Sequence, residues 1–203
     1  MKKSNRSNLN VLLSIVIIII IVTIGYMMIY ANNPFIELAN LVQAPMMGSL
    51  LNQTAPAIVG TSDWLNVDNP NGLTLADLKG KVVLLDFWTY SCINCIRTLP
   101  YLTGWDKTYR NKGLVIIGVH TPEFRFEKES PNVQAALKRY NIEYPVTLDN
   151  NSSTWHTYRV HYWPTLFLID KNGTIVYRHI GEGAYAETEQ KIQALLTVTS
   201  PSP

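Results

Sequence analysis

The only two cysteines of this 203-residue chain lie three positions apart, in Cys92-Ile93-Asn94-Cys95. They follow Val82–Trp88, an apolar and β-branched run that predicts a buried strand. A disulfide across this spacing would enclose almost no chain, so it would remove little entropy from the unfolded state and would be a poor structural crosslink. We therefore expect the pair to exchange with a partner's sulfur, bind a metal ion or reduce an oxidant.

An N-terminal apolar segment predicts the compartment in which this pair works. Leu9–Tyr30 is apolar almost throughout and long enough to cross the hydrocarbon layer of a membrane. Basic residues precede it, and no Lys or Arg occurs between Ala31 and Pro70, so the N-terminus is expected in the cytoplasm and the domain outside. The alternative is a cleaved signal peptide, which the long apolar run and the missing Ala-x-Ala site disfavour. The net charge of +2 gives no indication of nucleic-acid binding.

The organisation expected along the chain is a basic cytoplasmic tail at 1–8, a transmembrane signal anchor at 9–30, a juxtamembrane linker at 31–55, a globular domain at 56–198 and a disordered tail at 199–203. Strand patterns in the domain are at 81–87, 114–119, 144–148, 165–169 and 174–179. Helical or turn patterns are at 75–80, 93–109, 131–140, 153–158 and 187–196. A kink is expected at Pro100 and a hairpin turn at Lys171-Asn172-Gly173. This alternation predicts an α/β fold with a mixed central sheet flanked by helices.

The order strand, CxxC, helix also predicts different roles for the two thiols. A helix that begins inside the motif places Cys92 at its N-terminus, where free N–H groups and the helix dipole favour a thiolate. Cys95 follows one turn later on the same face and is expected to be buried. Cys92 would then attack a substrate disulfide, and Cys95 would resolve the mixed disulfide that results.

The segments around the pair resemble those of known oxidoreductases. Asp86-Phe87-Trp88 followed by Cys92-x-x-Cys95 is similar to the active-site segment of thioredoxins, and residues 74–88 are similar to the corresponding segment of membrane-tethered TlpA-type thiol-disulfide oxidoreductases. Four further segments resemble the extracytoplasmic thioredoxin-like domain of DipZ-type proteins: 87–95, 120–124, 148–151 and 162–164. The resemblance implies a thioredoxin fold over nearly the whole domain, a redox disulfide between Cys92 and Cys95, and no cofactor or metal.

The resemblance also implies partners. Substrates would be exported proteins with thiols or disulfides, and the candidates are proteins with misplaced disulfides, apocytochromes of cytochrome c biogenesis that await haem, or an oxidised repair enzyme. In DipZ-type proteins the domain is joined to a multi-span electron-carrying membrane domain. A single anchor in its place implies a separate membrane electron-transfer protein of the CcdA/DsbD kind.

Two residues take roles from the thioredoxin resemblance. Asp86 matches the buried carboxylate that takes the proton from the resolving thiol, whereas the alternative is a strand-end Asp that reaches water. Pro164 matches the cis-proline that faces the CxxC, and the alternative is an ordinary trans proline at a strand start. Trp88 is expected to pack under the CxxC loop.

Other residues near the motif are candidates for substrate contact or proton transfer. Tyr90 and Ser91 flank Cys92 and are expected in the docking surface, together with Trp163, which precedes Pro164. His120 and Glu123 follow the strand at 114–119 and are candidates for proton transfer. The favoured interpretation of these last two is a loop of solvated polar residues.

Several departures from the family pattern leave the redox direction open, with a reductase preferred. The dipeptide between the cysteines is Ile-Asn, and Thr98 stands where related reductases tend to carry an acidic residue. Thr89-x-x-Cys92 is half of a peroxiredoxin signature, so a thiol peroxidase is one alternative, although Leu85 stands where proline is expected. A copper-delivery module is the other, and its additional ligand would come from one of four histidines: His120, His156, His161 or His179.

Overall fold

A computed structural model describes residues 23, 50–61, 63–69 and 71–198 of the chain. The expected anchor at 9–30 apart from Thr23, the tail at 199–203 and the linker up to residue 49 lie outside the described residues. Within the described ranges, no helix is both long enough and apolar enough to cross a membrane. The chain divides into two compact units, residues 1–49 and 50–203, and the features below belong to the second.

The second unit alternates strands with helices, as the sequence predicts. The strands are β1 (Asp63–Leu65), β2 (Val82–Trp88), β3 (Leu114–His120), β4 (Val146–Leu148), β5 (Thr165–Ile169) and β6 (Ile175–Ile180). The helices are α3 (Ile93–Tyr109), α4 (Ser130–Arg139), α5 (Ser153–Thr157) and α6 (Tyr185–Thr197), with short 3-10 turns η1 (Arg110–Lys112) and η2 (Arg125–Lys128).

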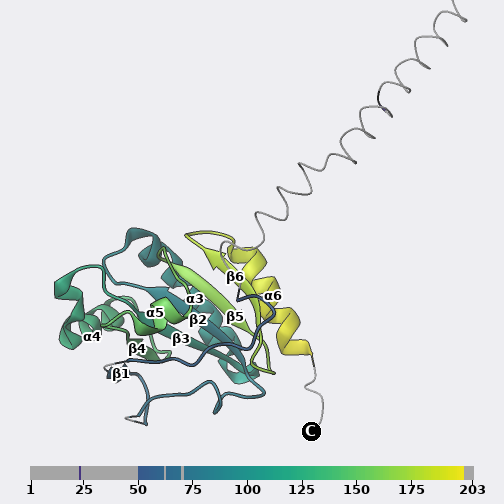
Figure 1. Cartoon of the computed structure of the whole chain (residues 1–203), viewed down its shortest axis with the longest axis horizontal. Coiled ribbons are helices and arrows are strands. Elements are labelled where there is room, and N and C mark those ends of the chain that lie inside the picture. Colours follow the sequence, from purple (N-terminus) through teal and green to yellow (C-terminus); the bar gives the residue numbers. More distant parts are fainter. Residues whose placement is uncertain (1–22, 24–49, 62, 70, 199–203) are drawn as a thin grey trace, which may run out of the picture. The chain divides into compact units, whose positions relative to one another are not determined.

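In the described part of the chain, six strands form one mixed sheet in the order β1-β4-β3-β2-β5-β6. β2 runs parallel to β3, and β3 runs parallel to β4, while the other neighbours are antiparallel. The expected mixed sheet is therefore confirmed, with β1 at one end and β6 beside α6 at the other (Figure 1). Because parallel strands end at the same edge, Trp88 is level with His120, and the chain enters the CxxC segment from this edge.

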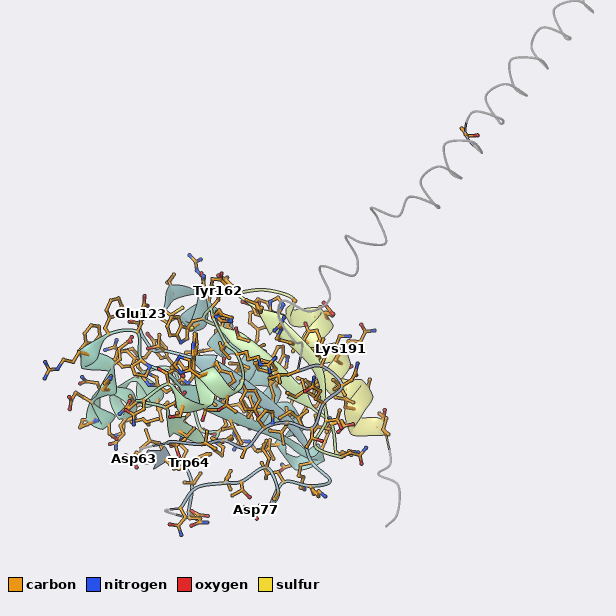
Figure 2. All side chains as sticks on the ribbon, viewed as in Figure 1. Asp63, Trp64, Asp77, Glu123, Tyr162 and Lys191 are labelled. Carbon is orange, nitrogen blue, oxygen red and sulfur yellow. The ribbon has the colours of Figure 1, made fainter. Side chains whose placement is uncertain are left out.

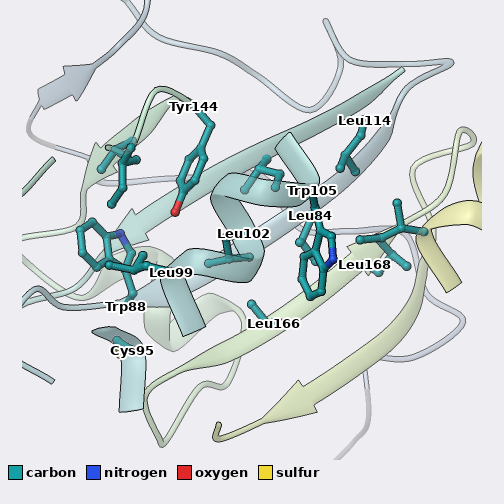
Figure 3. Close-up of a cluster of buried hydrophobic side chains, with 14 of the residues drawn as sticks. Leu84, Trp88, Cys95, Leu99, Leu102, Trp105, Leu114, Tyr144, Leu166 and Leu168 are labelled. Atoms are coloured by element: carbon teal, nitrogen blue, oxygen red, sulfur yellow. The ribbon is translucent and has the colours of Figure 1, made fainter. Parts of the chain in front are cut away.

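Two apolar cores cover the two faces of the sheet, and β2 contributes to both because its side chains alternate. Leu84 and Trp88 face the core that is built against α3, which Figure 3 shows. Leu85 and Phe87 face the opposite core, where Phe87 packs against Tyr158 with ring centroids 5.3 Å apart. All seven residues of β2 are buried, which explains its nearly continuous apolar sequence.

Some local predictions are corrected by the structure. Residues 75–80 form successive i→i−3 turns instead of a helix, such as Leu78 N–H to Leu75 O at 3.3 Å. Residues 50–55, expected in the linker, lie against the β5–β6 hairpin, where Asn52 N–H donates to Ile175 O at 2.8 Å. The hairpin turn itself is present, and Gly173 takes the left-handed φ of 87° that the turn requires.

Candidate active site

The helix α3 begins immediately after Cys92, at the bounds that the sequence predicts. Cys92 is the N-cap, with extended φ and ψ of −71° and 116°, and its sulfur accepts the Cys95 N–H at 3.4 Å. The helix continues through Pro100 to Tyr109. Sulfur at this position therefore takes the place of the usual capping oxygen and faces the N–H groups of the first turn.

The two thiols are free, and their surroundings differ strongly. Cys92 is half-buried, whereas Cys95 is only 2% exposed. A hydrogen bond from the Cys95 thiol, helped by the backbone N–H groups of Cys95 and Asn94, lowers the pKa of Cys92 to about 6. Burial, the bond to Cys92 and the negative charge of Asp86 raise the pKa of Cys95. Cys92 is thus the thiol that ionises near neutral pH.

Asp86 lies on the α3 face of β2 and is fully buried, so the alternative of an Asp that reaches water is wrong. Neither carboxyl oxygen has a hydrogen-bond partner among the described residues. Burial, followed by the negative charge of Cys92, raises the pKa of Asp86 to about 8. A buried acid that titrates near neutral pH beside two thiols has the properties of a proton acceptor or donor.

The loop before β5 borders the same edge of the sheet. The Trp163–Pro164 peptide bond is cis, as predicted. Thr165 is paired with Phe87 in the sheet register, so Pro164 lies level with the end of β2. Trp163 is half-buried, donates its indole N–H to Thr121 O at 3.2 Å and packs on Trp155 at 4.3 Å between ring centroids.

His120 and Glu123 occupy different environments, which corrects part of the sequence interpretation. His120 is the last residue of β3 and is fully buried, stacked on Tyr90 with ring centroids 5.5 Å apart. Burial lowers its pKa to about 4, so the imidazole is neutral at physiological pH instead of a solvated charge. Glu123 is exposed, as that interpretation expects, and projects from the surface, as does Tyr162 (Figure 2).

A buried carboxylate that the sequence analysis did not select, Glu127, supports the segment before Cys92. Its oxygens accept the Ser91 hydroxyl at 2.5 Å and the backbone N–H groups of Glu123 and Phe124 at 2.6 and 2.8 Å. Burial alone would raise its pKa, but bonds from Ser91, Thr89 and those N–H groups hold the pKa below its usual value. One sequence feature could have identified Glu127: it stands three residues after Phe124, the N-cap of η2, and a Glu at that position can accept the N–H of the cap residue.

The two rival functions receive little support from this geometry. The buried Thr89 hydroxyl lies 3.4 Å from His120 Nε2 and also bonds to Glu127, so it is engaged away from Cys92, where a peroxidase would use it. Among the residues that the structure describes, no group of three or more His, Cys, Asp or Glu side chains could hold a metal ion. A copper module would need such a third ligand.

Comparison with known proteins supports a common origin for these features. The model of the Redoxin family matches residues 50–196. Protein DipZ of Mycobacterium tuberculosis is 47% identical over 148 residues, which are 73% of this chain and 21% of that protein. Thiol-disulfide oxidoreductase ResA of Bacillus cereus is 34% identical over 129 residues, which are 64% of this chain and 69% of that protein.

A solved structure agrees with these relatives. The thioredoxin domain of a thiol-disulfide oxidoreductase from Bacteroides vulgatus matches with a TM-score of 0.58 and 28% identity, covering 70% of this chain and 97% of that one. This chain spans about a fifth of the DipZ protein that it matches, but more than two thirds of ResA. The fold is therefore thioredoxin-like, an α/β arrangement of helices around a mixed sheet. Because the family model covers well over half of the chain, this protein belongs to the Redoxin family, as a thioredoxin-like protein of the TlpA/DipZ type.

Proposed function

We propose that this protein is a membrane-anchored, extracytoplasmic thiol-disulfide oxidoreductase that reduces disulfides in exported proteins. The observation that carries the proposal is the contrast between two adjacent thiols. Cys92 is half-buried with a lowered pKa, and Cys95 is buried with a raised pKa beside the buried acid Asp86. The kinship with thiol-disulfide oxidoreductases such as ResA supports the same activity.

In the first step, the Cys92 thiolate attacks one sulfur of a substrate disulfide. The substrate S–S bond breaks as the new Cys92–substrate bond forms, and the released substrate thiolate takes a proton from solvent. With a pKa of about 6, Cys92 is mostly ionised at pH 7 and needs no separate base for this attack.

In the second step, the Cys95 thiol gives its proton to the Asp86 carboxylate and attacks the Cys92 sulfur. The Cys92–Cys95 disulfide forms, the Cys92–substrate bond breaks, and the second substrate sulfur leaves as a thiolate. Two electrons have then passed from the protein's dithiol to the substrate. Because Cys92 carries no charge in the mixed disulfide, one cause of the raised Asp86 pKa is absent when the base is needed.

Residues at the same edge of the sheet would hold the substrate. Pro164 and Trp163 face the end of β2, and the carbonyl before the cis-proline is proposed to pair with an extended substrate backbone. Tyr90 and Ser91 border Cys92 on the other side, with Trp88 buried beneath them. Glu127 fixes this border by its bond to Ser91, which makes Glu127 a positioning residue. Glu123 and His120 are given no proton-transfer role, since one is exposed and the other is a buried neutral imidazole.

The pKa of Cys92 favours reduction over oxidation. A strongly oxidising thioredoxin-like protein such as DsbA has a nucleophilic cysteine with a pKa near 3.5, whereas the value in thioredoxin is about 7. The value of about 6 in this chain is nearer to thioredoxin. A reductase outside the cytoplasm needs electrons, and we propose that a separate membrane protein of the CcdA/DsbD kind supplies them, with Leu9–Tyr30 as the anchor that keeps the two proteins in one membrane.

Trapping of substrates tests the two-step mechanism. The variant Cys95→Ser should accumulate partners on Cys92 as mixed disulfides that a reductant releases, because the second step is blocked. The matched control, Cys92→Ser together with Cys95→Ser, should trap nothing. If the single variant traps no more protein from the membrane and exported fractions than this control, while the wild type exchanges disulfides, the mechanism is wrong.

The direction and the compartment need their own measurements. A reduction potential near about −270 mV for the Cys92–Cys95 couple would support a reductase, whereas a value near about −120 mV would indicate an oxidase. Reporter enzymes fused after residue 203 and inserted before residue 9 should be active on opposite sides of the membrane. Both reporters on one side would contradict the proposed topology.

A further inference from the structure

Three buried polar side chains on the α3 face of the sheet have atoms without a hydrogen-bond partner among the described residues. They are the Asp86 carboxyl oxygens, the Trp88 indole Nε1 and the Tyr144 hydroxyl. All three residues are at most 2% exposed. Buried polar groups are nearly always paired, so a set of unpaired ones in one region calls for a functional explanation. The proposed mechanism uses Asp86 but assigns no role to Tyr144.

The sheet register brings these groups to one place. Asp86 on β2 is paired with Gly118 on β3, and Gly118 is paired with Val146 on β4. A Cβ atom on Gly118 would lie 2.9 Å from Trp88 Nε1 and 3.4 Å from Tyr144 Cε2. The absent side chain therefore leaves the space beside Asp86 that the indole N–H and the tyrosine ring occupy. Figure 3 shows the Tyr144 hydroxyl directed into the core on the side where Trp88 lies.

The chemistry of the three groups is complementary. A phenol O–H and an indole N–H donate hydrogen bonds, and a carboxylate accepts them. Burial raises the pKa of Tyr144 well above its usual value, and the negative charges of Asp86, Asp106 and Cys95 raise it further, so the phenol keeps its proton throughout the reaction. The charges that act on Asp86 and Tyr144 come from acidic groups of β2, of α3 and of its N-cap Cys92, and all of them are negative. Among the described residues, hydrogen bonding is therefore the means to stabilise an ionised Asp86.

We propose that the Tyr144 hydroxyl is the hydrogen-bond donor that stabilises the ionised Asp86 carboxylate while it waits to accept the proton of Cys95, with Trp88 Nε1 as a second donor. The bond forms directly, after a small rotation of the side chains, or through one bridging water. This inference rests on the proposed thiol-disulfide exchange. Tyr144 acts through Asp86 and is a positioning residue, not one that touches the reacting sulfurs.

The two steps of exchange can be followed separately in the full chain with a small aromatic disulfide whose thiolate product is coloured. Attack by Cys92 releases the first equivalent of colour, and resolution by Cys95 releases the second. The rate of the second phase should rise with pH as Asp86 ionises. In Tyr144→Phe the midpoint of that rise should move up by about one pH unit, which is about a tenfold slower second phase below both midpoints. The first phase should be unchanged.

Tyr158→Phe is the matched control, because it removes a buried tyrosine hydroxyl from the opposite core. Tyr158 is fully buried and donates to Pro56 O at 2.5 Å, remote from the α3 face. This variant should leave the midpoint of the second phase where it is in the wild type. An equal shift in both variants would show a general packing effect and would overturn the inference.

The remaining outcomes distinguish the inference from the proposed function. A wild type that releases no second equivalent contradicts the exchange mechanism itself. An unshifted midpoint in Tyr144→Phe, with a normal first phase, overturns only the role of Tyr144. If Tyr144→Phe loses the first phase, the variant Gly118→Ala tests the inference instead. The added Cβ atom displaces Trp88 Nε1 and the Tyr144 ring from Asp86, so the pH midpoint of the second phase should rise. An unshifted midpoint in Gly118→Ala then overturns the inference.

Discussion

Replacing Asp86 with Asn should make this protein more stable and less active at the same time. Asn has nearly the shape of Asp but cannot ionise. In the folded dithiol form the pKa of Asp86 is raised from 3.8 to about 8, chiefly by burial. The folded state therefore binds this proton more tightly than the unfolded state, so the stabilisation from the bound proton is complete below about pH 4 and is lost as pH rises through 8.

The size of the effect follows from the difference between the two pKa values. About four pKa units correspond to about 6 kcal/mol in full, and about 4 kcal/mol of this is lost by pH 7. Asp86→Asn has no such titration. Its free energy of unfolding should therefore exceed that of the wild type by up to about 4 kcal/mol at pH 7, and the difference should nearly vanish at pH 4.

Urea denaturation of both proteins in the dithiol form, at a series of pH values from 4 to 9, measures this difference. Asp77→Asn is the control, because Asp77 is exposed and its hydrogen bonds with Thr74 lower the pKa of its carboxyl. Loss of that carboxylate should change stability in the opposite direction at neutral pH. A difference between the wild type and Asp86→Asn that stays constant from pH 4 to pH 8 would refute the reasoning.

The kinetic half of the same prediction is independent. Asp86→Asn should form the mixed disulfide on Cys92 at a normal rate but resolve it slowly, because the Cys95 proton has lost its acceptor. Rapid mixing with the coloured aromatic disulfide measures both rates. A variant that gains stability but resolves at the wild-type rate would remove the proton-transfer role from Asp86.

Two further predictions concern the neighbouring groups. Alkylation by iodoacetamide should modify Cys92 with a half-maximal rate near pH 6, and Cys95 should stay unmodified until the chain unfolds; mass spectrometry of the digested protein identifies the site, and preferential labelling of Cys95 would reverse the assigned order. Glu127→Gln should lower the free energy of unfolding at pH 7 by about 1–3 kcal/mol, because the Ser91 hydroxyl and the backbone N–H groups of Glu123 and Phe124 lose the charged acceptor that the buried Glu127 provides. Since the pKa of Glu127 is lowered in the folded state, that loss should shrink as pH falls through the acid range. In urea denaturation at pH 7, the exposed neighbour substitution Glu129→Gln should leave the free energy of unfolding nearly unchanged.

Local patterns predicted the central elements of the fold well. The helix at 93–109 begins and ends at the predicted residues. Its start was predictable because Cys92, in the CxxC segment, is its N-cap. The predicted strands at 81–87 and 165–169 differ from β2 and β5 by at most one residue at an end. Both are buried on two faces, and burial of that kind gives continuous apolar runs that a sequence reveals.

The missed elements depend on contacts between distant residues. β1 has three residues and no run of its own, and it is a strand because Asp63 pairs with Leu148 across the sheet. Residues 50–55 look like linker in composition, but they bond to the β5–β6 hairpin more than 100 positions later. Neither contact leaves a periodic pattern in the local sequence.

The predicted site residues likewise lie in recognisable local patterns, whereas the missed one depends on a contact between distant residues. The order strand, CxxC, helix gave the roles of Cys92 and Cys95, and the resemblance to thioredoxins gave those of Asp86 and Pro164. Glu127 lies between Phe126 and Lys128 in a segment with no motif, and only the fold of η2 turns its carboxylate inward to Ser91.

The alternation of side chains along β2 also restricts how the gene can change in length. Loss of one codon between Val82 and Asp86 would move the carboxyl group of Asp86 to the opposite face, among the rings that pack around Phe87 in the intact strand. Chemistry and packing would then fail together, so selection should remove such deletions.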